Sequence, residues 1–253
     1  MAPVQDQIVF VTGASSGIGE ATARQCVEAG ARVVLAARRG DRVEALAQRL
    51  GERAHAVTLD VRDRASIERA VSELPEAFAR VSVLVNNAGL ALGLGPLDAL
   101  SGEDADTVID TNIRGLVACT QAFLPGMIER GRGHVINLGS VAGTYPYPGG
   151  HIYGGTKAFV HQFSLALRAD LLGKGVRVTC LEPGMVESEF SRVRFKGDEA
   201  RATAVYENFE ALTPDDIAAT IVWCASLPPR VNVNTLELMP INQAFSPFAV
   251  RRG

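Results

Sequence analysis

Cysteine and aromatic residues are scarce in this chain of 253 residues, which has 4 Cys and 6% Phe, Trp and Tyr together. Cys26, Cys119, Cys180 and Cys224 lie far apart, without the paired spacing of a disulfide framework or a zinc site. We therefore predict four buried, unpaired thiols and no metal site.

Long runs of one kind of residue are also missing. The 25 Lys and Arg stand against 28 Asp and Glu and form no basic block, which leaves no footprint for the phosphates of a nucleic acid. No apolar run approaches the roughly 20 residues that span a bilayer, and residues 1–7 lack the basic and apolar pattern of a secretory leader. These absences predict a cytoplasmic protein that binds neither nucleic acid nor membrane.

Short β-branched apolar runs alternate with longer helical patterns along the chain, whose residues are 47% hydrophobic. The predicted strands are Ile8–Thr12, Arg32–Ala36, His55–Leu59, Val81–Val85, His134–Leu138, Val176–Leu181 and Thr235–Met239. The predicted helices are Gly17–Ala29, Asp41–Leu50 with Asp41 as a possible cap, Arg64–Phe78, Thr107–Arg130, Tyr153–Leu172 and Pro214–Ser226. This repeat predicts one α/β domain over residues 1–253: a Rossmann-type, doubly wound parallel sheet of seven strands with helices on both faces.

Two stretches, Gly143 to Gly150 and Glu187 to Lys196, interrupt the alternation. Both follow strands of the second half, and ligands of doubly wound sheets bind beyond the carboxyl ends of the strands. We predict that the lid segment, residues 185–200, covers a substrate. The alternative is an irregular surface connection.

A glycine-rich turn follows the first predicted strand and opens the first helix. Glycines at such offsets let the backbone approach a pyrophosphate, whose charge the helix N-terminus favours. A purely structural turn is the alternative reading. The residues predicted to hold a dinucleotide here are Gly13, Ser15, Ser16, Gly17, Ile18 and Gly19.

Arg38 and Arg39 stand where an NAD-binding protein would carry an acidic residue, and the planar guanidinium suits a 2′-phosphate. The sequence thus predicts NADP as the cofactor, unless these arginines are only a solvated helix start. Asp60 and Val61 are predicted at the adenine. The Asn86–Gly89 run, of which Asn87, Ala88 and Gly89 are the predicted contacts, is placed along the nicotinamide ribose or is a simple turn.

Ser140, Tyr153 and Lys157 form the candidate catalytic group. On a helix, Tyr153 and Lys157 share one face about a turn apart, and a nearby ammonium favours the phenolate. Tyr153 can then act as an acid or base near neutral pH, while Ser140 hydrogen-bonds the substrate oxygen. A Tyr-x-x-x-Lys pair alone occurs by chance on many helices, so the prediction depends on its combination with Ser140 and the glycine turn.

Together these motifs resemble the short-chain dehydrogenase/reductase family over almost the whole chain. The resemblance implies that Asn112 holds a water that links Lys157 to solvent. It also implies that Lys157 grips the nicotinamide ribose and that the turn after the sixth strand contacts the nicotinamide amide. The cofactor contacts of that turn are Pro183, Gly184 and Val186.

A narrower resemblance is to the NADP-dependent 3-hydroxy acid dehydrogenases. It lies in Asn86–Gly93, Leu124–Met127, Tyr153–Val160, Val193–Asp198 and Asn232–Glu237. It implies oxidation of serine, L-allo-threonine and related 3-hydroxy acids, reduction of malonic semialdehyde, and a homotetramer, to which the tail Phe245 to Gly253 is a candidate contact. One departure is that this chain carries Glu187 and Glu189 where the group has a glycine-rich run.

A 3-hydroxy acid needs a cationic or hydrogen-bonding partner for its carboxylate. Arg194 is the first candidate because the narrower resemblance includes it; its other reading is a salt bridge to Glu187, Glu189 or Asp198. Arg192, Lys196, His151 and Tyr147 are further candidates. Two other functions stay open: a reductase of a neutral ketone or 3-oxoacyl thioester, and an NADP-binding regulator without turnover.

Overall fold

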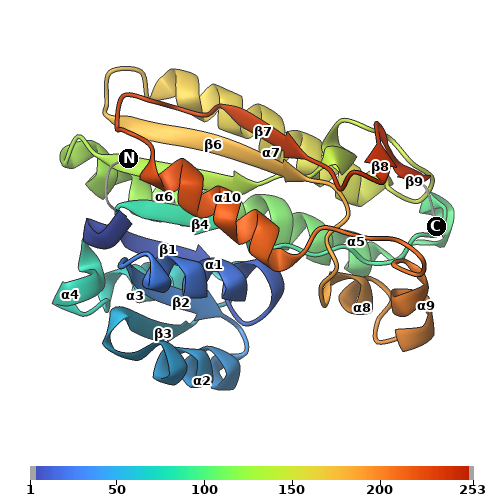
Figure 1. The fold of residues 1–253 in the computed structure, drawn as a ribbon, viewed down its shortest axis with the longest axis horizontal. Helices are drawn as coiled ribbons and strands as arrows, with labels where there is room; N and C mark the ends of the chain where they lie inside the picture. The colour runs from blue at the N-terminus through green and yellow to red at the C-terminus, as the bar shows by residue number, and fades with distance from the viewer. Residues whose placement is uncertain (1–3, 251–253) are drawn as a thin grey trace.

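The computed structural model describes residues 4–250, with the backbone alone for 246–250. Its centre is one parallel sheet of seven strands in the order β3-β2-β1-β4-β5-β6-β7 (Figure 1). The order reverses between β1 and β4, which is where doubly wound sheets open a crevice beyond the strand ends. The strands are β1 Ile8–Thr12, β2 Arg32–Ala37, β3 Ala54–Thr58, β4 Val83–Asn86, β5 Gly133–Leu138, β6 Val176–Pro183 and β7 Thr235–Leu238.

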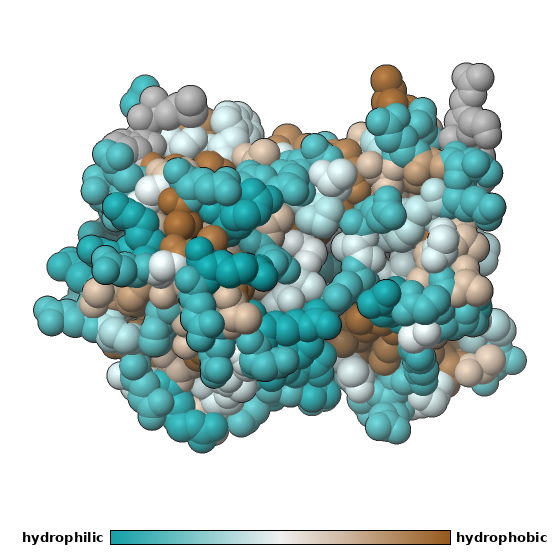
Figure 2. Space-filling model, turned by 60° about the horizontal axis from the view of Figure 1, so that its bottom comes forward, coloured by the Kyte–Doolittle hydropathy of each residue, from teal (hydrophilic) through white to brown (hydrophobic). Residues whose placement is uncertain are grey.

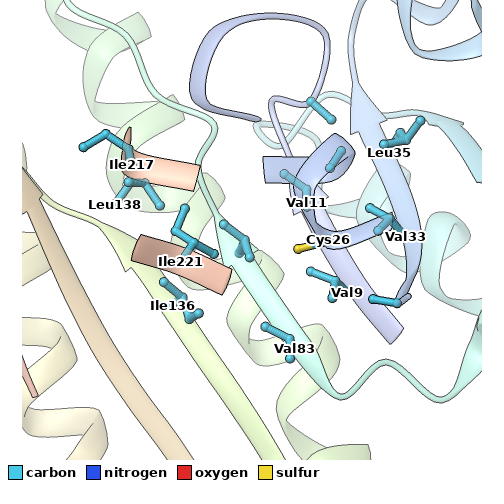
Figure 3. Close-up of a cluster of buried hydrophobic side chains, with 14 of the residues drawn as sticks. Val9, Val11, Cys26, Val33, Leu35, Val83, Ile136, Leu138, Ile217 and Ile221 are labelled. Atoms are coloured by element: carbon cyan, nitrogen blue, oxygen red, sulfur yellow. The ribbon is translucent and has the colours of Figure 1, made fainter. Parts of the chain in front are cut away.

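Helices cover both faces of this sheet, as predicted. One cluster of buried side chains joins α1, α2 and α10 to one face, and a second joins α3, α6 and α7 to the other. Figure 3 shows Cys26 of α1 and Ile217 and Ile221 of α10 directed at the strands in the first cluster. The helices are α1 Gly17–Glu28, α2 Gly40–Leu50, α3 Arg64–Ser72, α4 Glu76–Ala79, α5 Gly102–Ile109, α6 Leu116–Glu129, α7 His151–Asp170, α8 Phe190–Arg194, α9 Glu199–Ala204 and α10 Pro214–Ser226.

The strands alternate between these two clusters, which explains why they are apolar at almost every position. Val9 and Val11 face one cluster while Phe10 between them faces the other, and all three side chains are fully buried. The side of the molecule brought forward in Figure 2 is mainly hydrophilic, with hydrophobic residues in separate areas. All four cysteines are free and buried, as predicted.

Two predicted helices were wrong in extent. The predicted helix Arg64–Phe78 ends at Ser72, and Pro75 precedes the separate α4, because proline has no N–H for a continuing helix and restricts the residue before it. The predicted helix Thr107–Arg130 begins earlier, with Ser101 capping α5, and is interrupted by one π-helical stretch, η4 Asp110–Gly115. An extra residue in a turn changes the direction of side chains and is frequent at functional sites.

Helix starts are confirmed in one case and corrected in another. Thr213 and Asp216 form the capping box of α10, whose predicted bounds are confirmed. Asp41 does not cap α2: the capping position is Arg39, and Asp41 lies in the first helical turn, where its charge still suits the helix dipole.

Short elements complete the chain: the 3-10 turns η1 Val4–Asp6, η2 Gly51–Arg53, η3 Leu97–Ala99 and η5 Val141–Gly143, and the hairpin of β8 Gln243–Ala244 and β9 Ser246–Val250. The tail predicted to contact a neighbouring subunit begins here. The Phe245 ring lies 5.9 Å from the Tyr145 ring, whereas Arg251 and Arg252 fall outside the described residues. Within residues 4–250, no helix combines the length and hydrophobicity that crossing a bilayer requires.

Candidate functional site

A cavity of about 560 Å³ opens at the carboxyl ends of the strands. It brings together motifs that are far apart in the chain: the glycine turn after β1, the turns after β2, β3 and β4, and Ser140 after β5. The predicted site residues that line it are Gly13, Ser15, Ser16, Gly17, Ile18, Arg38, Arg39, Asp60, Val61, Asn87, Ala88, Gly89, Ser140, Tyr153, Lys157, Pro183, Gly184 and Val186. The predicted residues Gly19, Asn112 and Arg194 are not among those that line the cavity.

The glycine turn is shaped by close backbone approaches. Gly13 has φ +69°, and a Cβ there would lie 3.0 Å from the Ala88 backbone. A Cβ on Gly19 would meet the Gly13 carbonyl oxygen and come within 2.6 Å of Asn87 Nδ2. The backbone is therefore open toward the cavity at a helix N-terminus, which fits the pyrophosphate of a dinucleotide.

The two asparagines after β4 have different partners. Asn86 is buried, and its Nδ2 donates to Asn137 Oδ1 at 2.9 Å and Thr120 Oγ1 at 3.0 Å, which ties β4 to β5 and α6. Asn87 Nδ2 donates to the Thr12 carbonyl at 2.9 Å and to the Gly13 carbonyl at 3.2 Å. Asn86 thus supports the sheet, while Asn87 fixes the glycine turn and faces the cavity.

The part of the cavity that the sequence predicts to hold adenosine is lined by Asp60, Arg38 and Arg39. Asp60 accepts a 2.7 Å hydrogen bond from Arg62 Nη2, and the hydrogen bonds from Arg62 lower the pKa of this carboxyl. Arg39 is held through three nitrogens, by Ser15, Ser16 and Glu189. The ion pair to Glu189 was not predicted, since 150 residues separate the two in sequence.

Tyr153 and Lys157 lie on α7, one turn apart, as predicted. Lys157 Nζ is buried, donates to the Leu138 carbonyl at 2.6 Å and lies 5.7 Å from the centroid of the Tyr153 ring. Burial in apolar surroundings lowers the pKa of Lys157 to about 8. Ser140 accepts a hydrogen bond from the Ala142 backbone at 3.1 Å, which orients its hydroxyl.

The pKa of Tyr153 differs from the sequence expectation. Removal of water from the partly buried hydroxyl raises it, while the charge of Arg194 and a hydrogen bond with Ser140 lower it by less. Lys157 makes its hydrogen bond to Leu138 instead. Arg194, and not Lys157, is therefore the cation that opposes this rise in the pKa of Tyr153.

Asn112 lies in the π-helical stretch and is buried. Its Nδ2 donates to the Leu90 carbonyl at 2.9 Å and to Thr156 Oγ1 at 3.0 Å, and its Oδ1 accepts from the Leu90 backbone at 2.9 Å. A Cβ on Gly89 would be 3.3 Å from Asn112 Oδ1 and 3.6 Å from Lys157 Nζ. Asn112 Oδ1 and Lys157 Nζ thus both approach the Cβ position of Gly89.

The three cations of the lid segment have different partners. Arg192 Nε pairs with Glu199 at 2.6 Å, and Lys196 Nζ pairs with Asp104 at 2.7 Å. Arg194 makes none of the predicted salt bridges; its Nη2 donates to Tyr147 Oη at 3.2 Å, and its buried Nε has no hydrogen-bond partner among the described residues. Its guanidinium carbon lies 5.2 Å from the Tyr153 ring centroid.

The remaining candidates are engaged elsewhere. His151 begins α7 and its Nε2 lies 3.1 Å from the Gly95 carbonyl oxygen.

Cys180 belongs to a group with His161 and Glu182 whose possible metal-binding atoms lie within 4.8 Å of one another. The 2.7 Å hydrogen bond between His161 Nδ1 and Glu182 Oε1 accounts for this proximity.

Sequence reasoning missed the residues that the lid segment adds to the cavity, Ser188, Glu189, Phe190 and Val193. The Phe190 ring packs 5.5 Å from the Tyr153 ring. A departure from the glycine-rich run was visible at Glu189, but no local pattern indicates where its carboxylate points.

Comparison with known proteins gives one family. The pattern described as short chain dehydrogenase matches residues 7–199. NADP-dependent 3-hydroxy acid dehydrogenase YdfG of Salmonella typhi is 55% identical over 97% of this chain and all of that protein, and serine 3-dehydrogenase of Agrobacterium fabrum is 50% identical over 96% and 98%. The closed form of a serine dehydrogenase complexed with NADP+ superposes with a TM-score of 0.94 at 50% identity, covering 98% of this chain and 100% of the other.

Proposed function

Because the chain belongs to the short-chain dehydrogenase family, we propose that it is an NADP-dependent oxidoreductase that interconverts 3-hydroxy acids and 3-oxo acids. Serine, L-allo-threonine and malonic semialdehyde are the proposed substrates. The supporting observation is that Arg194 brings a partly buried guanidinium beside Tyr153, and that its Nε has no hydrogen-bond partner in the part of the chain that the structure describes. A carboxylate bound there would have its hydroxyl-bearing carbon near the catalytic candidates.

The residues at the cavity fit NADP(H). The open backbone at Gly13 and Gly19 would receive the pyrophosphate, and Arg38 and Arg39 would face the 2′-phosphate. Asp60, Val61, Asn87–Gly89 and the turn Pro183–Val186 would line the rest of the cofactor. When bound, NADP(H) supplies the hydride acceptor or donor.

Tyr153 is proposed to exchange the proton of the substrate hydroxyl, and Ser140 to hold the substrate oxygen by a hydrogen bond. Lys157 would grip the nicotinamide ribose and, with the cofactor bound, add its charge to that of Arg194 in favouring the phenolate of Tyr153. Asn112 would hold a water that connects Lys157 to solvent. Arg194 is proposed to bind the substrate carboxylate. Before substrate binds, its positive charge also opposes the rise that burial causes in the pKa of Tyr153.

The substrate class is tested by following reduced nicotinamide with NADP+ or NAD+ across serine, L-allo-threonine, 3-hydroxyisobutyrate, 3-hydroxypropionate and matched neutral alcohols. We expect turnover of the acids with NADP+. Turnover of the neutral alcohols alone would favour a ketone reductase instead. If none of these compounds is turned over, a 3-oxoacyl thioester with NADPH is the next substrate to test. No turnover of the thioester, with retained NADPH binding, would favour a regulator.

The role of Arg194 is tested with Arg194→Ala, and Arg192→Ala is the matched control because Arg192 is also a lid arginine but is exposed and paired with Glu199. Loss of a charge-assisted hydrogen bond is expected to raise KM for the acids about tenfold or more. KM for neutral alcohols, and all constants of Arg192→Ala, should stay within about threefold. Equal effects of Arg194→Ala on acids and neutral alcohols would contradict the assignment.

We also propose that the protein works as a homotetramer in the cytoplasm. The assembly rests on the resemblance to the 3-hydroxy acid dehydrogenases. Sedimentation of the purified protein tests it, and a monomer at working concentration would contradict it.

A further inference from the structure

Glu189 lies between two arginines at the adenosine end of the cavity. Its carboxylate is 2.9 Å from Arg39 Nη1 and 2.9 Å from Arg42 Nη1. Glu189 stands directly before α8, so these ion pairs join the lid segment to the turn after β2 and to α2. A second close approach lies beside them, since a Cβ on Gly17 would be 3.4 Å from Ser188 Cβ.

Arg39 has a partner on each of its three guanidinium nitrogens. Nε donates to Ser15 Oγ at 3.0 Å, Nη2 donates to Ser16 Oγ at 2.7 Å, and Nη1 is bonded to Glu189. Arg38, which also lines the cavity, makes no hydrogen bond through its guanidinium within the described part of the chain. A 2′-phosphate that approaches Arg39 therefore meets the carboxylate of Glu189 on the same guanidinium.

Two negative groups cannot share these arginines without cost. Partial burial by itself would raise the pKa of Glu189, but the hydrogen bonds from Arg39 and Arg42 outweigh it and lower the pKa to about 2. Glu189 thus stays ionised throughout the neutral pH range, so protonation does not remove its negative charge when a phosphate binds. A phosphate near it is repelled, or it displaces the carboxylate from the arginines.

We propose that Glu189 is a cofactor-specificity residue, whose carboxylate competes with the 2′-phosphate of NADP for Arg39 and Arg42. Glu189 thereby weakens the preference for NADP over NAD that the arginines alone would give. The inference rests on the proposed cofactor.

The test compares Glu189→Gln with a control variant, Glu187→Gln. The control also removes one negative charge, but from an exposed side chain two positions earlier in the chain. Dissociation constants of NADPH and NADH are measured by nicotinamide fluorescence, and those of adenosine 2′,5′-bisphosphate and 5′-AMP by calorimetry. None of these readouts requires turnover. For Glu189→Gln we expect about three- to tenfold tighter binding of NADPH and of the bisphosphate.

Glu189→Gln should change the dissociation constants of NADH and 5′-AMP by less than about twofold. Glu187→Gln should change the dissociation constants of all four ligands by less than about twofold. Unchanged or weaker NADPH binding by Glu189→Gln would overturn the proposal, because Glu189 would then orient Arg39 instead of competing for it. If the wild type prefers NADPH and the variant keeps that preference unchanged, only the role of Glu189 fails. If the wild type binds neither dinucleotide, the proposed cofactor fails with it.

Discussion

The site has a floor, formed by the turns after β1, β4 and β5, and a lid segment, residues 185–200, and these two regions are fixed by different contacts. In the floor, Asn86 and Asn87 bind strand and turn groups through buried or partly buried hydrogen bonds. In the lid segment, Glu189, Arg192 and Lys196 are fixed by ion pairs at the surface. Buried networks resist local opening, whereas exposed pairs contribute little.

This difference separates the residues proposed to carry out catalysis from those proposed to select the substrate and the cofactor. Ser140, Tyr153 and Lys157 belong to the rigid sheet and α7, where small displacements are costly. The residues proposed to select substrate and cofactor, Arg194 and Glu189, lie in the segment with weaker attachments. Substitutions should therefore have large effects on turnover or stability in the floor, and only small effects on stability in the lid segment.

The largest effect is expected from Tyr153→Phe, which keeps the ring and removes the hydroxyl. Loss of the proposed general acid/base should reduce turnover about 10³-fold, which corresponds to about 4 kcal/mol. NADPH affinity, measured by fluorescence, should stay within about threefold because the ring still packs on Phe190. Turnover within about tenfold of wild type would contradict the role of Tyr153.

The next largest effect is expected from Gly19→Ala, which changes the backbone packing of the floor. The added methyl would meet the Gly13 carbonyl and the Asn87 amide, so the glycine turn must shift. We expect a loss of about 2 kcal/mol in the free energy of unfolding by denaturant, together with weaker NADPH binding. Gly102→Ala at the exposed start of α5, where φ is not positive and a Cβ meets nothing within 4 Å, is the control for the methyl itself. Equal losses in both variants would mean that the close approach at Gly19 is unimportant.

Lys157→Met should stabilise the protein near pH 7 by about 1 kcal/mol while turnover is lost. Burial lowers the pKa of Lys157 from 10.5 to about 8, a cost of roughly 3 kcal/mol for the charged form, offset in part by its bond to Leu138.

The sign of this effect depends on pH. The cost of burying the ammonium is fully present below the folded pKa of about 8 and is relieved as pH rises toward the unfolded value. Denaturation at pH 7 and at pH 10, without cofactor, should therefore show the advantage of Lys157→Met disappearing at the higher pH. A variant less stable than wild type by the same amount at both values would refute this account.

The smallest effect is expected from Lys196→Ala in the lid segment. The ion pair to Asp104 involves a Lys196 side chain that is 63% exposed, so its loss should change the free energy of unfolding by less than about 0.5 kcal/mol. Denaturant titration in low and high salt measures it. A loss above about 1 kcal/mol would show that the lid segment is as firmly attached as the floor.

Local spacing made much of this protein predictable. The exact bounds of β1 and α10, and the position of Tyr153 and Lys157 one turn apart on α7, follow from strand and helix periods that hold in any protein. The end of the helix near Pro75 and the interruption at Asp110–Gly115 were missed, because proline position and an added residue in a turn act against an otherwise regular pattern.

The sequence by itself determined the order of strands and helices, the family motifs and the residues that each strand end delivers to the crevice, because these depend on neighbours within a few positions. Only the tertiary structure decided which lid cation has no carboxylate partner within the described residues, and that Glu189 reaches Arg39. Such pairings join groups as far as 150 positions apart, and their geometry exists only after the whole chain has packed.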